Sequence, residues 1–301
     1  MSADVAFALS MGLVIFGQLL NAGSVLIDKY IVTQTAVTRP GVYVFYVGMI
    51  SGVVLLLLPF GLIHRPDMTT VWLSLDIGFV FIASILFLYR ALKHANATDV
   101  VAWLTAVSAM TTFIFGALFT NEELPRAFPF AMGLFVIGML CVGHFRFYAR
   151  SFLQVIMSGL LFGLSAVLLK ILFSHTSFID GFFWSRMGNM IAALSLLFFP
   201  SIRNHVFHIT RSTPSKVRAL IIANRVLNGV AFLCILYAIR VGSVSLVNSL
   251  SSLQFVFIFL LILVLAKYLP KLYEHEFRPG HILHKVVAMC FISVGFIVLF
   301  L

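Results

Sequence analysis

Two arginines stand inside long apolar segments of the chain, where a charged side chain is energetically unfavourable. Arg186 lies about eight residues into the run 178–200, and Arg225 about eight residues into the run 217–239. At ~1.5 Å of helical rise per residue, each lies roughly 12 Å from the end of its segment, near the middle of a bilayer. A charge there costs at least about 2.5–3.5 kcal/mol, so it faces a cavity or a partner. A guanidinium fork suits a carboxylate or a phosphate.

Amide and hydroxyl side chains stand in the same and neighbouring apolar segments. They are Gln18, Asn21, Asn189, Asn224, Asn228, Asn248, Ser249, Ser251, Ser252 and Gln254. Asn224 and Asn228 are four residues apart and share a helix face, as do Asn248 and Ser252. Any one of them could simply form an interhelical hydrogen bond, worth about 0.6 kcal/mol. Together they predict a polar central cavity, with stacking or apolar walls from Trp103, Trp184, Tyr89 and Tyr237.

Two acidic residues are candidates for proton coupling. Asp76 lies in the apolar run 71–93, and Glu122 lies in the break between two apolar runs. Asp76 is also the expected partner of the arginines if these form a structural bridge. Because Arg186 and Arg225 outnumber Asp76 as deep charges, we expect a cargo with an anionic group.

The sequence offers little for catalysis. The histidines fall mostly in the two long loops, 201–216 and 267–284, and no HExxH motif, paired cysteines or glycine-rich phosphate loop accompanies them. The three cysteines lie within apolar runs, as small packing residues do. We therefore expect no catalytic residue, no metal and no cofactor. A membrane enzyme that uses the loop histidines is the alternative from another functional class.

The composition defines the elements that hold these side chains. Of 301 residues, 61% are apolar and only 10% are charged, and the mean hydropathy is +1.10. Soluble domains have roughly 45–50% apolar and about 25% charged residues, so this chain is an all-α integral membrane protein. Its net charge of +10 fits basic loops at lipid headgroups, and no basic run is dense enough for nucleic acid. The partners expected are a small-molecule metabolite and the lipid bilayer.

Span-length windows give ten apolar segments. They are 5–28, 41–63, 71–93, 98–119, 127–145, 152–173, 178–200, 217–239, 244–266 and 285–301. A shift of 141 residues superposes Lys29 on Lys170 and Pro59 on Pro200, and a shift of 147 superposes Lys93 on Arg240. The chain therefore divides into two five-helix units, 1–148 and 149–301. Because five is odd, the second unit enters the membrane from the opposite side and the repeats are inverted.

Two related motifs end corresponding parts of the halves. Residues 88–93 (Leu-Tyr-Arg-Ala-Leu-Lys) precede an apolar segment that ends at 121–124 (Asn-Glu-Glu-Leu). The second half repeats the pattern at 236–240 (Leu-Tyr-Ala-Ile-Arg), before an apolar segment that ends at 267–269 (Lys-Tyr-Leu). This arrangement resembles the ten-helix EamA-like branch of the drug/metabolite transporter superfamily. The resemblance implies a basket of ten helices with a central cavity and alternating access.

The second half departs from the family pattern. Lys267 stands where the repeat usually has an acid, an extra stretch precedes the last segment, and the proline common midway along the fourth and ninth helices is missing. These departures leave the substrate open. We expect a secondary transporter, with no enzymatic activity, for a small polar or amphipathic and anionic metabolite. A flippase or transporter of a lipid-linked or headgroup-bearing molecule is the alternative.

The expected location is the cell (inner) membrane, with several spans. The loop charges and the family resemblance predict opposite orientations of the chain in the membrane. Most basic loop residues follow odd-numbered segments, and only Arg65, Arg126 and Arg240 lie on the other side. If basic loops stay cytoplasmic, both termini face outward. The family resemblance implies that both termini are inside.

Overall fold

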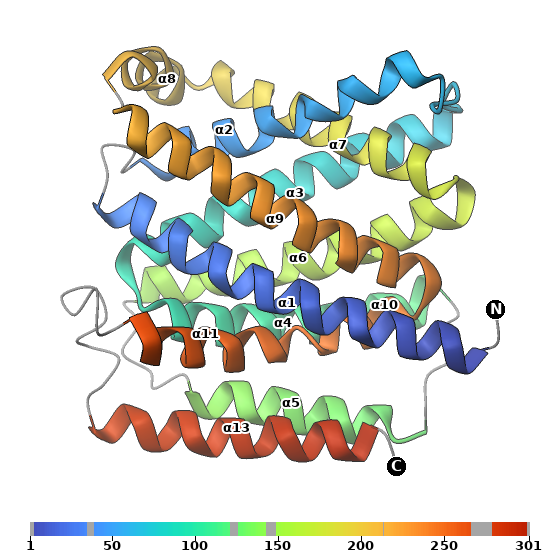
Figure 1. Cartoon of the computed structure of the whole chain (residues 1–301), viewed down its shortest axis with the longest axis vertical. Helices are drawn as coiled ribbons and strands as arrows, with labels where there is room; N and C mark the ends of the chain where they lie inside the picture. Colours follow the sequence, from blue (N-terminus) through green and yellow to red (C-terminus); the bar gives the residue numbers. More distant parts are fainter. Residues whose placement is uncertain are drawn as a thin grey trace.

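The structure of the protein is a computed structural model that describes residues 3–34, 39–120, 126–142, 149–212, 214–265 and 279–299. These residues are almost entirely helical and contain no strand. The helices lie side by side, and most run along a common direction (Figure 1). An all-helical bundle satisfies every backbone hydrogen bond within each segment, as the interior of a lipid bilayer requires.

Seven helices of the described residues are long and apolar enough to cross a membrane. They are α1 (Ala3–Gln34), α2 (Pro40–Ile50) with η1 (Ser51–Phe60), α3 (Met68–His94), α4 (Ala97–Phe119), α6 (Ala149–His175), α9 (Ser215–Val241), and α10 (Val244–Ser249) with α11 (Ser252–Leu265). The chain is therefore a multi-pass membrane protein.

Four further helices complete the described part of the bundle. α7 (Phe178–Ser195) continues through η2 (Leu196–Phe198) and then bends by 104° into α8 (Pro200–Ser212), and this pair counts as an eighth candidate span. α5 (Phe128–Val142) and α13 (Pro279–Leu299), which are shorter in their apolar parts, lie side by side at one edge of the bundle (Figure 1). Each of the ten expected segments contains a helix, while the number of ten spans stays a prediction.

Two features of the backbone differ from the sequence expectation. Residues 201–216 were expected to form a loop, but most of them form α8, which Figure 1 shows end-on at the corner of the bundle. The ninth segment breaks between α10 and α11 at Leu250 and Ser251, although no proline lies there. The break is spanned by short turns, with the amide of Leu253 donating to the carbonyl of Leu250 at 3.0 Å.

Helices from the two halves of the chain interleave. α1 packs along α9, and α6 packs along α3 and α4. α7 packs on α3 at Gly78 and Gly188, where a Cβ added to Gly188 would overlap the carbonyl oxygen of Ser74. Only glycine permits two helix backbones to approach this closely, so this pair closes the contact between α3 and α7.

Two lysines make matching contacts in the two halves. Lys29 on α1 donates from Nζ to the carbonyls of Leu92 (2.6 Å) and Ala95 (2.7 Å) at the end of α3. Lys170 on α6 donates in the same way to the carbonyls of Ile239 (2.9 Å) and Gly242 (2.5 Å) at the end of α9. Each cation satisfies the last carbonyls of a helix, where the helix dipole is negative. Both lysines thus anchor helix ends within the bundle.

Candidate functional site: a central polar cavity

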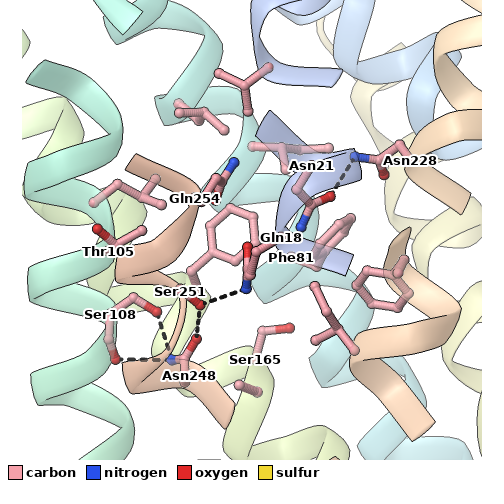
Figure 2. A pocket seen from close by; sticks show the side chains of 18 of the residues that line it. Gln18, Asn21, Phe81, Thr105, Ser108, Ser165, Asn228, Asn248, Ser251 and Gln254 are labelled. Carbon is pink, nitrogen blue, oxygen red and sulfur yellow. Dashed lines mark hydrogen bonds between the residues drawn. The ribbon is translucent and has the colours of Figure 1, made fainter. Parts of the chain in front are cut away.

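A cavity of about 160 Å³ lies between α1, α3, α4, α6, α9 and the broken α10–α11 segment. Its lining therefore comes from both halves of the chain (Figure 2). The polar lining residues are Gln18, Asn21, Asp28, Tyr89, Thr105, Ser108, Ser165, Arg225, Asn228, Asn248, Ser251 and Gln254. The rings of Phe81, Phe162 and Phe232 form apolar walls. In volume the cavity resembles the engineered space of about 150 Å³ that holds benzene, so it suits a small ligand.

A buried ion pair closes one side of the cavity. Arg225 on α9 pairs through Nη2 with Asp28 Oδ1 on α1, and the two residues are 9% and 4% exposed. The Tyr89 hydroxyl on α3 donates to Asp28 Oδ2 at 3.1 Å, and Tyr43 on α2 donates to Oδ1. The amide of Asn224 donates to Oδ1 at 2.7 Å. Four donor groups from three helices, α2, α3 and α9, thus compensate one buried carboxylate on α1, as a buried charge requires.

The guanidinium is held through its two terminal nitrogens, while its buried Nε has no partner among the described residues. Its Nη2 also donates to the Tyr43 hydroxyl at 2.9 Å and its Nη1 to the Tyr89 hydroxyl at 3.4 Å. The Tyr43 ring lies under it, with 5.4 Å between the guanidinium carbon and the ring centroid. Arg225 is therefore fixed in position and neutralised by Asp28.

The expected bridge from the arginines to Asp76 is wrong, because Asp28 is the partner of Arg225 and Asp76 lies exposed on α3. Sequence reasoning missed Asp28 because the first apolar segment was expected to end at residue 28. α1 instead continues to Gln34, and Asp28 lies inside the bundle. The available signal was the pair of charged residues at 28 and 29 with no turn residue beside them. Glu122 lies outside the described residues.

A second hydrogen-bond network crosses the other end of the cavity (Figure 2). Gln18 donates from Nε2 to the Ser251 hydroxyl at 3.1 Å, and Ser251 donates to Asn248 Oδ1 at 3.4 Å. The Asn248 amide donates to the Ser108 hydroxyl at 2.9 Å and to Thr112. The break between α10 and α11 makes this possible, since it lets Ser251 face α1 while Asn248 faces α4. The buried Oε1 of Gln18 accepts no hydrogen bond from any described residue, so it is available to a ligand donor.

Arg186 lies next to the central cavity rather than in it. Its guanidinium carbon stands 4.0 Å from the ring centroid of Phe232, 5.7 Å from Phe81 and 5.8 Å from Phe182. It lines a second cavity of about 670 Å³, which shares Val47, Phe81, Arg225, Asn228 and Phe232 with the central one. We call this second space the side cavity. Since Arg225 is paired, the expectation of an anionic cargo now rests chiefly on Arg186.

The structure brings only part of the predicted set together. Gln18, Asn21, Arg225, Asn228 and Asn248 line the central cavity, and the Asn228 amide donates to Asn21 Oδ1 at 3.4 Å. The other expected lining residues lie behind its wall or away from it: Asn189, Asn224, Ser249, Ser252, Trp103, Trp184 and Tyr237.

Each residue outside the lining has its own surroundings. Asn189 is fully buried where α7 packs on α3, and Asn224 belongs to the ion-pair network. Trp103 packs edge-on against Phe152 at 5.0 Å between ring centroids, and Tyr237 packs edge-on against Phe178 at 5.5 Å. The two aromatics therefore serve helix packing and do not wall the cavity. Ser251, Gln254 and Tyr89, which the sequence also suggested, line the cavity as expected.

No family model and no curated protein matches the sequence. A solved crystal structure, which carries no protein name, superposes with a TM-score of 0.65 at 17% sequence identity. The match covers 99% of this chain and 98% of that chain. At this identity the likeness shows the fold alone.

Proposed function

We propose that this chain is a secondary transporter with ten transmembrane helices, built as two inverted repeats at 1–148 and 149–301 and similar to EamA-like transporters. The matching contacts of Lys29 and Lys170 support the repeat. A shift of 141 relates the two lysines, and a shift of 147 relates their acceptors Leu92 and Ala95 to Ile239 and Gly242. A matching tertiary contact supports the repeat more strongly than similarity among apolar residues does. The donor on one helix and the acceptors on another must both correspond between the two halves.

The observation that carries the proposal is the polar cavity enclosed between the two halves. Lipid-facing helices need no amides at mid-bundle, yet Gln18, Asn21, Asn228 and Asn248 converge on one space. A site at the interface of inverted repeats becomes accessible from alternate sides when one repeat rocks against the other. In this account the chain needs no cofactor and performs no covalent chemistry, and it resides in the cell (inner) membrane.

The cargo is a small polar or amphipathic metabolite with an anionic group. Asn248, Gln18 and Ser251 present amide and hydroxyl groups to its polar part, and Phe81 and Phe232 contact its apolar part. A cargo carboxylate that reaches Arg225 competes with Asp28 for the guanidinium. A proton on Asp28 would release the guanidinium, so Asp28 replaces Asp76 as the residue for proton coupling.

Counterflow into proteoliposomes tests the proposal. Vesicles are preloaded with pools of unlabelled amino acids, dicarboxylates or sugar phosphates, and uptake of the labelled compound is measured. A thermal-shift screen against the same classes selects the pool, because a ligand that binds the folded state raises the melting temperature. We expect one class to exchange, and Asn248→Leu to abolish that exchange. Absence of exchange for every class that raises the melting temperature would overturn the proposal.

A further inference from the structure

The side cavity opens toward the bilayer between η1 and α9. Its inner end is formed by Phe81, Phe232 and Arg186. Its outer rim is formed by apolar side chains with large exposed fractions: Val53 60%, Leu56 69%, Ile222 59% and Val226 63%. In a membrane-spanning protein such exposed apolar side chains face lipid. The cavity therefore connects the interior of the bundle to the acyl-chain region.

The contact that the proposed repeat relates to this opening, between α3 and α7, is closed. There α7 packs directly on α3 at Gly78 and Gly188, with no room for a side chain between the backbones. The shift of 147 places Arg225 at the position of Gly78. The α3–α7 contact is thus sealed by glycine, whereas the boundary between η1 and α9 has an arginine and an open space of about 670 Å³.

Arg186 is the polar group that gives this space a preference for one ligand. It forms no hydrogen bond or ion pair with any residue in the described part of the chain, and its buried Nε has no partner. The lining contains no acidic residue, and its other cation, Arg225, is neutralised by Asp28. A guanidinium surrounded by three phenylalanine rings and unpaired gains most from an anion with acceptor oxygens.

The rest of the lining selects what must be attached to that anion. Apart from Arg186, Arg225, Ser51 and Asn228, the lining residues are apolar, and the volume lies within the range of about 300–1,000 Å³ typical of ligand pockets. An anion from water would have to cross the apolar rim. An anion at the end of an alkyl chain enters from the bilayer with its chain along Val53 and Val226.

We propose that the side cavity is a binding site for a single-chain anionic amphiphile that enters from the bilayer, with its head group on Arg186 and its chain between η1 and α9. Binding at this site does not require that the bound molecule is transported. The side cavity shares Val47, Phe81, Arg225, Asn228 and Phe232 with the central cavity, but the rest of its lining is almost entirely apolar and it has Arg186 in place of Asp28.

Native mass spectrometry of the purified full chain in neutral maltoside detergent tests this site. The probe is dodecyl phosphate, compared with inorganic phosphate and with dodecyltrimethylammonium. We expect dodecyl phosphate to bind even when the maltoside detergent is in excess. Inorganic phosphate and dodecyltrimethylammonium should not displace it. Equal binding of the cationic amphiphile, or displacement by inorganic phosphate at matched concentration, would overturn the proposal.

Two variants locate the bound probe, and each has a matched control. Arg186→Gln removes the cation, and Arg90→Gln removes an exposed arginine from α3 outside both cavities. Gly229→Leu fills the side cavity, because a Cβ at Gly229 meets no atom within 4 Å, and Gly12→Leu adds the same bulk at another open position.

We expect Arg186→Gln to weaken dodecyl phosphate binding by about tenfold or more, the factor expected on loss of a charge-assisted hydrogen bond. Gly229→Leu weakens it by a similar factor, and both controls bind as the unmodified protein does. If Arg186→Gln does not fold, Gly229→Leu decides alone, because it creates no buried charge or overlap. Unchanged binding in folded Gly229→Leu would refute the site.

Discussion

Removal of Asp28 tests whether the buried ion pair organises the bundle. Asp28→Ala leaves Arg225 charged and without its carboxylate, and it removes the acceptor of Tyr43, Tyr89 and Asn224. Loss of one partner of a buried ion pair costs about 3–5 kcal/mol. At roughly 2–4 °C per kcal/mol for a chain of this size class, the melting temperature should fall by about 6–20 °C.

The assay is thermal unfolding of the detergent-purified protein, followed by tryptophan fluorescence. Asp76→Ala is the matched control, because Asp76 also lies on a membrane-spanning helix but is exposed. The double variant Asp28→Ala with Arg225→Leu leaves no unpaired charge, so it should be more stable than Asp28→Ala alone. Equal melting temperatures for Asp28→Ala and Asp76→Ala would refute this interpretation. So would a double variant whose loss of stability equals the sum of the losses caused by Asp28→Ala and Arg225→Leu alone.

The other predictions also use thermal unfolding. Lys29→Met and Lys170→Met should each lose about 1.5–3 kcal/mol, because each removes charged hydrogen bonds to helix-terminal carbonyls, and unequal losses would speak against the repeat. Gly188→Ala should lose about 1–3 kcal/mol, since its Cβ would overlap the Ser74 carbonyl, whereas Gly12→Ala, in open space, should cause no loss; similar melting temperatures would contradict this close contact. Hydrogen bonds from Thr70 lower the pKa of Asp67, the N-cap of α3. The stabilisation by the Asp67 carboxylate is therefore complete above the ordinary aspartate pKa and is lost as the pH falls through the lower folded-state pKa. The melting temperature of Asp67→Asn should therefore fall less between pH 7 and pH 3 than that of the unmodified protein. An identical fall in both proteins would exclude this contribution.

The sequence was sufficient for the class of protein and for the positions of the helices. Apolar runs of span length can be satisfied only by helices in lipid, so each expected segment contains one. Arg225, Gln18 and Asn248 were also predictable, because a polar side chain in an apolar run must face the interior. Their convergence on one cavity follows from the same constraint.

Features that depend on tertiary contact could not be predicted. Asp28 was hidden because the end of an apolar run does not mark the end of a helix, and α1 extends to Gln34. The sequence also could not tell which interior residues line the cavity and which pack between helices. Trp103 and Asn248 both lie inside apolar segments, but only Asn248 faces the central cavity. The side cavity exists because η1 and α9 do not pack directly on each other, and no local sequence pattern predicts that.

The most direct test of the transporter account is the accessibility of the central cavity from the two sides of the membrane. In a background without Cys141, Cys234 and Cys290, Asn248→Cys is exposed to a membrane-impermeant thiol reagent added outside or inside sealed vesicles. The control is Ala131→Cys, which should stay unmodified because Ala131 on α5 is buried where α5 packs on α13. Alternating access predicts modification of the cavity cysteine from both sides. Modification from one side only, or from neither, would contradict it.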